Sequence, residues 1–104
     1  MGERVRVAAL ADVAVGVSVP VEVEGRSLLV CRSASGVYAI ENLCSHQLAK
    51  LEGGKLKGPH IFCPLHGVRF DMRTGAPNGT LTKKPINVYE TTVEDDEVYA
   101  QLPG

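Results

Sequence analysis

Two short segments, each with one cysteine and one histidine, constrain this chain more than any other feature. The first reads Cys44-Ser45-His46, and sixteen residues later the second reads Cys63-Pro64-Leu65-His66. Thiolates and imidazoles are the ligands that soft and borderline metals prefer. Two loops that each supply one thiolate and one imidazole can together enclose a single inorganic centre, so the fold has to bring these loops together.

The order of the four side chains distinguishes two kinds of metal site. Structural zinc fingers usually group their ligands as Cys-x(2–4)-Cys followed by His-x(3–5)-His. Here cysteine and histidine alternate. This alternation, together with the run from Cys63 to Gly75, resembles the Rieske [2Fe–2S] family. A zinc-binding structural module is the competing interpretation, and colour separates the two because zinc is spectroscopically silent.

The Rieske resemblance covers nearly the whole chain and implies a role for each ligand. Cys44 and Cys63 would hold the inner iron of one cluster per chain, and His46 and His66 the outer iron. The second ring nitrogen of each histidine would lie near the surface, where electrons can leave. Because neutral imidazoles replace two thiolates, the oxidised centre carries no net charge, and it accepts an electron more easily than an all-cysteine cluster does.

Residues near the ligands indicate the branch of the family that this chain resembles. High-potential members carry two further cysteines that form a disulfide between the loops, and the corresponding positions here are Ala49 and Leu65. The same members place hydroxyl groups near the cluster, at positions that are Val68 and Phe70 here. Without these donors the reduced cluster is less stabilised, which predicts a potential of about −150 mV, the low end of the Rieske range.

Short apolar segments separated by glycine and proline predict an all-β chain. Strands are expected over residues 5–9, 17–23, 26–32, 37–40, 60–62, 68–71, 86–93 and 97–101. Hairpin turns are expected at Gly25 and at Glu94-Asp95-Asp96. The resemblance implies a single Rieske domain over residues 1–104: an antiparallel β-sandwich or barrel base with a small cluster-binding β subdomain inserted over about 42–71.

Composition excludes several classes of function. The chain has 104 residues and a formal net charge of −1, which argues against a nucleic-acid binder. No signal peptide and no long apolar segment are apparent, so a cytoplasmic protein without membrane contact is expected. Cys31 has no partner for a disulfide and lies in an apolar run, which predicts a buried thiol in a protein of a reducing compartment.

The histidine count indicates an electron carrier rather than an enzyme. A Rieske oxygenase subunit also needs a mononuclear iron held by two histidines and a carboxylate, and only His60 remains after the cluster is built. The chain resembles the ferredoxin components of bacterial aromatic-ring-hydroxylating dioxygenase systems. That implies a carrier that takes electrons from a flavin-dependent reductase and passes them to a terminal oxygenase. A monomer is expected, because nothing in the sequence demands a larger assembly. The alternative is a Rieske-like small subunit of a larger enzyme such as nitrite reductase.

Charged residues around the ligand loops leave two interpretations open. The basic ones could form a collar for the acidic patch of a partner, or be ordinary solvated loop charges; they are Lys50, Lys55, Lys57, Arg69 and Arg73. The acidic run over residues 94–97 is expected to be a solvated hairpin turn.

Overall fold

The computed structural model describes residues 2–44, 49–64, 68–78 and 84–103. Within these ranges the chain forms β-strands and one short 3-10 helix, which confirms the all-β prediction. The elements are β1 (Gly2–Ala9), η1 (Leu10–Asp12), β2 (Val17–Val23), β3 (Arg26–Ser33), β4 (Gly36–Glu41), β5 (Leu56–Lys57), β6 (His60–Phe62), β7 (Arg69–Asp71), β8 (Pro77–Asn78), β9 (Val88–Tyr89), β10 (Thr91–Glu94) and β11 (Glu97–Pro103).

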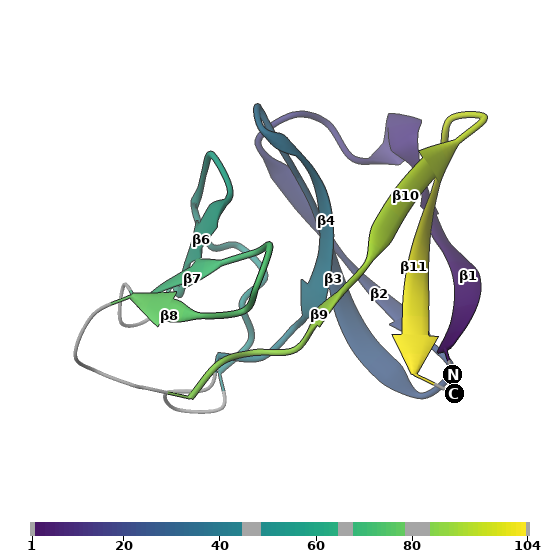
Figure 1. Cartoon of the computed structure of the whole chain (residues 1–104). Helices are drawn as coiled ribbons and strands as arrows, with labels where there is room; N and C mark the ends of the chain where they lie inside the picture. Colours follow the sequence, from purple (N-terminus) through teal and green to yellow (C-terminus); the bar gives the residue numbers. More distant parts are fainter. Residues whose placement is uncertain (1, 45–48, 65–67, 79–83, 104) are drawn as a thin grey trace.

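The strands pair into three antiparallel sheets, which lie side by side in Figure 1. The first has the order β1-β11-β10 and joins the two ends of the chain, with Gly2 opposite Pro103. The second has the order β2-β3-β4-β9, and the third, which we call the small sheet, has the order β5-β6-β7-β8. The second sheet therefore lies between the other two (Figure 1).

Strand β3 explains why the middle sheet holds the molecule together. Side chains of successive residues point to opposite faces of a strand. Leu28 and Val30 are buried in the core shared with the first sheet, whereas Leu29 and Cys31 are buried in the core shared with the small sheet. A strand that is covered on both faces is apolar throughout rather than alternating, and this accounts for the continuous run at residues 28–31.

Both predicted hairpin turns are present. Glu24 and Gly25 have φ angles of 50° and 77°, and Asp95 and Asp96 have φ angles of 51° and 63°. Two successive positive φ angles give the tight turn whose twist matches that of the flanking strands. Glu94, Asp95 and Asp96 are exposed at the second turn as expected, whereas Glu97 is half-buried. Both end residues of the run form ion pairs with β1, Glu94 with Arg4 and Glu97 with Arg6.

Two elements differ from the prediction. The strand expected over residues 86–93 is divided at Glu90, because β9 pairs with β4 and β10 pairs with β11 in another sheet. Alternating apolar residues give no information about which sheet a strand joins. The segment expected to be irregular after Thr74 contains β8, which pairs with β7 at the edge of the small sheet. Proline is tolerated there because an edge strand needs fewer amide donors.

The small sheet runs from Leu56 to Asn78 and is inserted between β4 and β9 of the middle sheet. Its last strand lies beyond residue 71, where the insertion was expected to end. Across the described residues, no helix is long and apolar enough to cross a membrane.

Candidate metal centre

The two predicted ligand cysteines are buried in the same hydrophobic core. Cys44 follows β4 and is fully buried, and Cys63 directly follows β6 and is 2% exposed. Both belong to the cluster of side chains between the middle sheet and the small sheet. Strands from two different sheets therefore deliver one thiol each to one interior region. His46 and His66, the other two predicted ligands, lie outside the described residues.

Each of these two cysteines begins a loop, and a hydrogen bond from the backbone N–H of the cysteine closes it. The N–H of Cys44 donates to the carbonyl of Ala49 at 2.5 Å, and the N–H of Cys63 donates to the carbonyl of Val68 at 2.8 Å. In both cases donor and acceptor are five residues apart, and the predicted histidine ligand lies between them in the sequence. The two loops thus share one closure pattern although their sequences differ.

The surroundings of the cysteines are apolar. Val68 is 4% exposed and Phe70 is fully buried, and both pack in the core that contains Cys44 and Cys63. Neither side chain can donate a hydrogen bond. These are the two positions at which high-potential Rieske proteins are expected to place hydroxyl groups, so the described core lacks those donors.

Cys31 differs from the other cysteines although it lies in the same core. It sits within β3, is fully buried, and its thiol lies 3.9 Å from the carbonyl oxygen of Leu29. Burial raises the pKa of Cys31 to about 12. The thiolate is the form that binds metals, so this side chain acts as a small apolar group, which confirms the prediction.

Asn42 is a buried polar residue that fixes the first loop, and its role was not predicted. It is 3% exposed, and its side-chain oxygen accepts hydrogen bonds from the backbone N–H groups of Leu51 and Glu52, both at 3.0 Å. Its amide nitrogen donates to Glu52 Oε1 at 3.0 Å. The loop that contains Cys44 is therefore held at both ends by one side chain. Asparagine after a strand gives no sequence signal for this contact.

Replacing Asn42 by alanine is expected to lower the free energy of unfolding by about 2–6 kcal/mol, because two backbone donors lose their acceptor at a cost of about 1–3 kcal/mol each. Denaturant unfolding of the cluster-loaded protein measures this effect. Glu52→Gln is the matched control, since it keeps an acceptor for the Asn42 amide, and a change within about 0.5 kcal/mol is expected. Equal effects of the two substitutions would contradict this role.

The structure also places the charged residues around the loops. Lys50 lies 3.8 Å from Glu52, and Arg73 contacts Asp71 at 2.8 Å. The Arg73 guanidinium donates to the Asp71 carboxylate and lowers its pKa to about 2. His60, which was not expected to be a ligand, lies on β6 opposite Asp71 in the small sheet.

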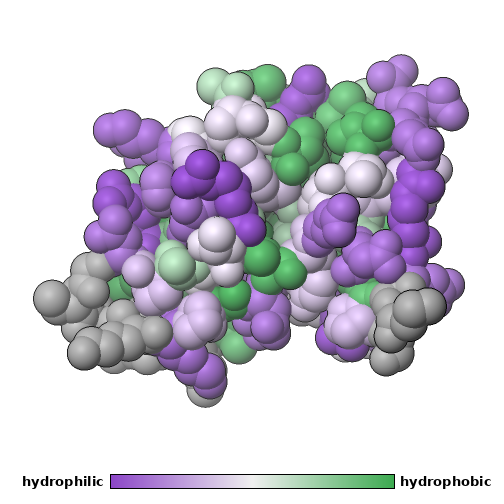
Figure 2. Space-filling model, viewed as in Figure 1, coloured by the Kyte–Doolittle hydropathy of each residue, from purple (hydrophilic) through white to green (hydrophobic). Residues whose placement is uncertain are grey.

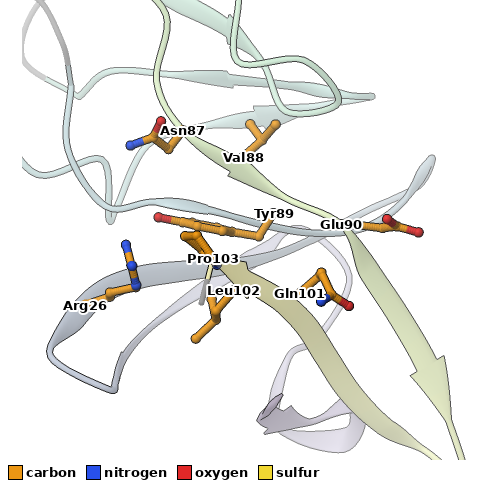
Figure 3. Close-up of a pocket in the computed structure, with 8 residues that line it drawn as sticks. All are labelled: Arg26, Asn87, Val88, Tyr89, Glu90, Gln101, Leu102 and Pro103. Carbon is orange, nitrogen blue, oxygen red and sulfur yellow. The ribbon is translucent and has the colours of Figure 1, made fainter. Parts of the chain in front are cut away.

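An open cavity of about 400 Å³ lies away from the cysteines, between β9, the end of β11 and the start of β3. Figure 3 shows the Tyr89 ring extending across it beside Pro103, with Arg26 and Asn87 toward one end and Glu90 and Gln101 toward the other. It contains no cysteine or histidine, so it forms no part of the candidate metal centre.

The described residues fit a thiolate-bound cluster. Two buried thiols on neighbouring closed loops could serve as sulfur ligands, and the core around them is apolar. Comparison with protein families agrees with this chemistry, because residues 3–90 match the model of the Rieske [2Fe-2S] domain.

Individual relatives cover most of the chain. The ferredoxin component of the naphthalene 1,2-dioxygenase/salicylate 5-hydroxylase systems of Ralstonia sp is 36% identical over 95 residues, which is 91% of each chain. Among solved structures, the ferredoxin of carbazole 1,9a-dioxygenase from Nocardioides aromaticivorans IC177 is 39% identical with a TM-score of 0.88, covering 96% of this chain and 98% of that one. A ferredoxin solved in complex with reduced oxygenase of carbazole 1,9a-dioxygenase is 35% identical, with a TM-score of 0.84 and coverage of 94% and 92%.

This chain belongs to the Rieske [2Fe–2S] family, and each chain carries one cluster of that type. Within the family it is of the ferredoxin type: an electron-transfer component of multicomponent dioxygenase systems rather than a catalytic subunit.

Proposed function

We propose that this ferredoxin accepts single electrons from a flavin-dependent reductase and delivers them to a terminal ring-hydroxylating oxygenase. The observation that carries the proposal is the similarity, over about nine-tenths of both chains, to ferredoxin components of dioxygenase systems. The ferredoxin solved with reduced oxygenase supports the terminal oxygenase as the acceptor. We further propose that the chain is a cytoplasmic monomer that functions without a membrane.

The proposed ligands are Cys44 and Cys63 for one iron and His46 and His66 for the other. When bound, the cluster supplies reversible one-electron chemistry. The buried thiols hold it, and the loop closures at Ala49 and Val68 fix the backbone beside each thiol. We propose a single domain over residues 1–104, with residues 42–71 as the core of the cluster-binding insertion.

The reduction potential is expected to lie near −150 mV, the low end of the Rieske range. Val68→Ser and Phe70→Tyr should raise it, because a new hydroxyl donor stabilises the more negative, reduced state. A hydrogen bond that is stronger by about 1 kcal/mol in the reduced state corresponds to roughly 40 mV for one electron. Redox titration followed by visible spectroscopy measures each value. A clearly positive potential of the unmodified protein would contradict the branch assignment.

Reconstitution tests the proposed function. The cluster-loaded protein is mixed with the reductase and terminal oxygenase of a naphthalene 1,2-dioxygenase system, and product formation is followed against ferredoxin concentration. We expect turnover that depends on the ferredoxin and stops without it. Absence of coupling with reductase and oxygenase pairs from the naphthalene and carbazole systems, while the cluster spectrum stays intact, would overturn the proposal.

The alternative function is that of a small subunit bound permanently to a nitrite reductase. A nitrite reductase small subunit from Mycobacterium tuberculosis has a TM-score of 0.89 with this chain but is only 16% identical, so the likeness concerns the fold. Size-exclusion chromatography of the natively isolated protein separates the two functions. A carrier elutes alone, whereas a subunit elutes with its large partner.

A further inference from the structure

The outward face of the small sheet carries an unusual set of side chains. Strand register places Leu56, Ile61 and Phe70 on one face, and these three pack toward the core that holds the cysteines. Residues that alternate with them share the opposite face. That face contains two rows across the strands: Lys57, His60 and Asp71 in one, and Lys55, Phe62 and Arg69 in the other.

The second of these rows lies next to the predicted ligand loop. Phe62 directly precedes Cys63, and Arg69 directly follows Val68, whose carbonyl closes the loop that begins at Cys63. Lys55 is joined to the same row by the hydrogen bond from the N–H of Phe62 to its carbonyl, at 2.9 Å. Basic side chains therefore border the end of the sheet from which the loop emerges.

Three of the basic residues on this face keep their charge uncompensated. Among the described residues, Lys55, Lys57 and Arg69 form no ion pair, whereas Arg73 is paired with Asp71 and Lys50 with Glu52. Lys55 and Lys57 are exposed and Arg69 is half-buried. We call these three residues the basic face. The part of the surface over β6 to β8 is mainly hydrophilic in Figure 2.

Charge is unevenly divided along the chain as a whole. Residues 42–78 contain five basic and two acidic side chains, whereas the remainder contains six basic and ten acidic side chains. Although the net charge of the whole chain is −1, residues 42–78 carry a net positive charge and the rest of the chain carries a net negative charge. Such a separation orients a charged partner before contact, and its range is about 10 Å at 0.1 M salt.

We propose that the basic face is a docking surface for a redox protein with an acidic surface, and that it turns the cluster-binding end of this chain toward that partner. The proposal deepens the proposed function and rests on it only for the identity of the partner. Redox encounters are usually small and transient. A few uncompensated charges beside the ligand loop are therefore sufficient to set the orientation and the association rate.

Stopped-flow electron transfer tests this surface with a defined probe. Reduced flavodoxin, an acidic flavoprotein, is mixed with the oxidised ferredoxin, so that the flavin loses one electron and the ferredoxin gains one. The rate constant is expected to fall by about tenfold between low and physiological ionic strength, although both proteins carry net negative charge. A rate constant that rises with salt would show repulsion and would overturn the proposal.

Charge reversal locates the effect. The double variant Lys55→Glu/Lys57→Glu is expected to slow the reaction with flavodoxin by about fivefold or more at low salt. Arg26→Glu reverses an exposed cation beside the β2–β3 turn at the base of the molecule, and it should leave the rate within about twofold. Equal slowing by both variants would mean that the position of the charge is irrelevant and would overturn the docking surface.

An oxidant of opposite charge completes the comparison. Oxidation of the reduced ferredoxin by the cation tris(phenanthroline)cobalt(III) should be faster in the double variant than in the unmodified protein, because the repelling charges are gone. Unchanged potentials and spectra in all variants separate this surface effect from damage to the cluster. If flavodoxin behaves as expected while reconstitution with dioxygenase components fails, the docking surface stands and the proposed partners are wrong.

Discussion

Replacing Cys63 by alanine is expected to yield colourless protein without bound iron or sulfide. The substitution removes one of the two proposed sulfur ligands, which are both buried in the core between the middle and small sheets. Cys44→Ala should give the same result, because Cys44 is the other proposed sulfur ligand. Iron and sulfide analysis, with the visible spectrum, measures the loss. Since cluster binding also stabilises the folded state, lower solubility of both variants is expected.

Cys31→Ala is the matched control for this experiment. Cys31 belongs to the same core and is equally buried, but it lies within a strand rather than at the start of a closed loop. This variant should keep full iron content and the unmodified potential, and it should lose only about 1 kcal/mol of stability through poorer packing. Retention of the cluster by the Cys63 variant, or its loss from the Cys31 variant, would refute the assignment of the ligands.

The contrast between these cysteines shows which parts of the candidate metal centre a sequence pattern can predict. Cys44 and Cys63 are recognisable because each lies near a histidine at a fixed spacing, and that spacing is a local property of the sequence. Cys31 is recognisable as a core residue because apolar residues surround it on both sides. The buried thiols, the closed loops and the apolar Val68 and Phe70 agree with these inferences.

Other features depend on contacts between distant residues, which local patterns do not record. Asn42 fixes its loop through backbone amides nine and ten residues away, and any polar residue at this position would have looked the same in the sequence. The expected strand over residues 86–93 is divided at Glu90 because β9 pairs with β4, whereas β10 pairs with β11 in another sheet. The alternation of apolar residues is compatible with either sheet.

Gly75 is the clearest case of a long-range constraint, and its substitution is expected to have the second large effect. It has a φ of 85°, and its N–H donates to the carbonyl of Asp71 at 2.6 Å, which closes the turn after β7. A Cβ at this position would lie 2.0 Å from the carbonyl oxygen of Ile86. Ile86 is a buried core residue, and its N–H donates back to the carbonyl of Gly75 at 3.0 Å. The turn and the returning chain are therefore joined backbone to backbone.

Gly75→Ala is expected to lower the free energy of unfolding by about 2–5 kcal/mol, because the unfavourable φ costs about 1–2 kcal/mol and the backbone clash adds about 1–3 kcal/mol. Gly16→Ala separates the two contributions. Gly16 has nearly the same φ, 88°, but a Cβ there would meet open space to a distance of 4 Å, so only the first cost applies. Gly54→Ala tests the clash, since its Cβ would lie 2.2 Å from the carbonyl oxygen of Phe62.

Denaturant unfolding should rank Gly75→Ala as the most destabilising of the three. If Gly16→Ala lowered the free energy of unfolding as much as Gly75→Ala does, the backbone conformation alone would explain the effect. The clash with Ile86 would then make no contribution.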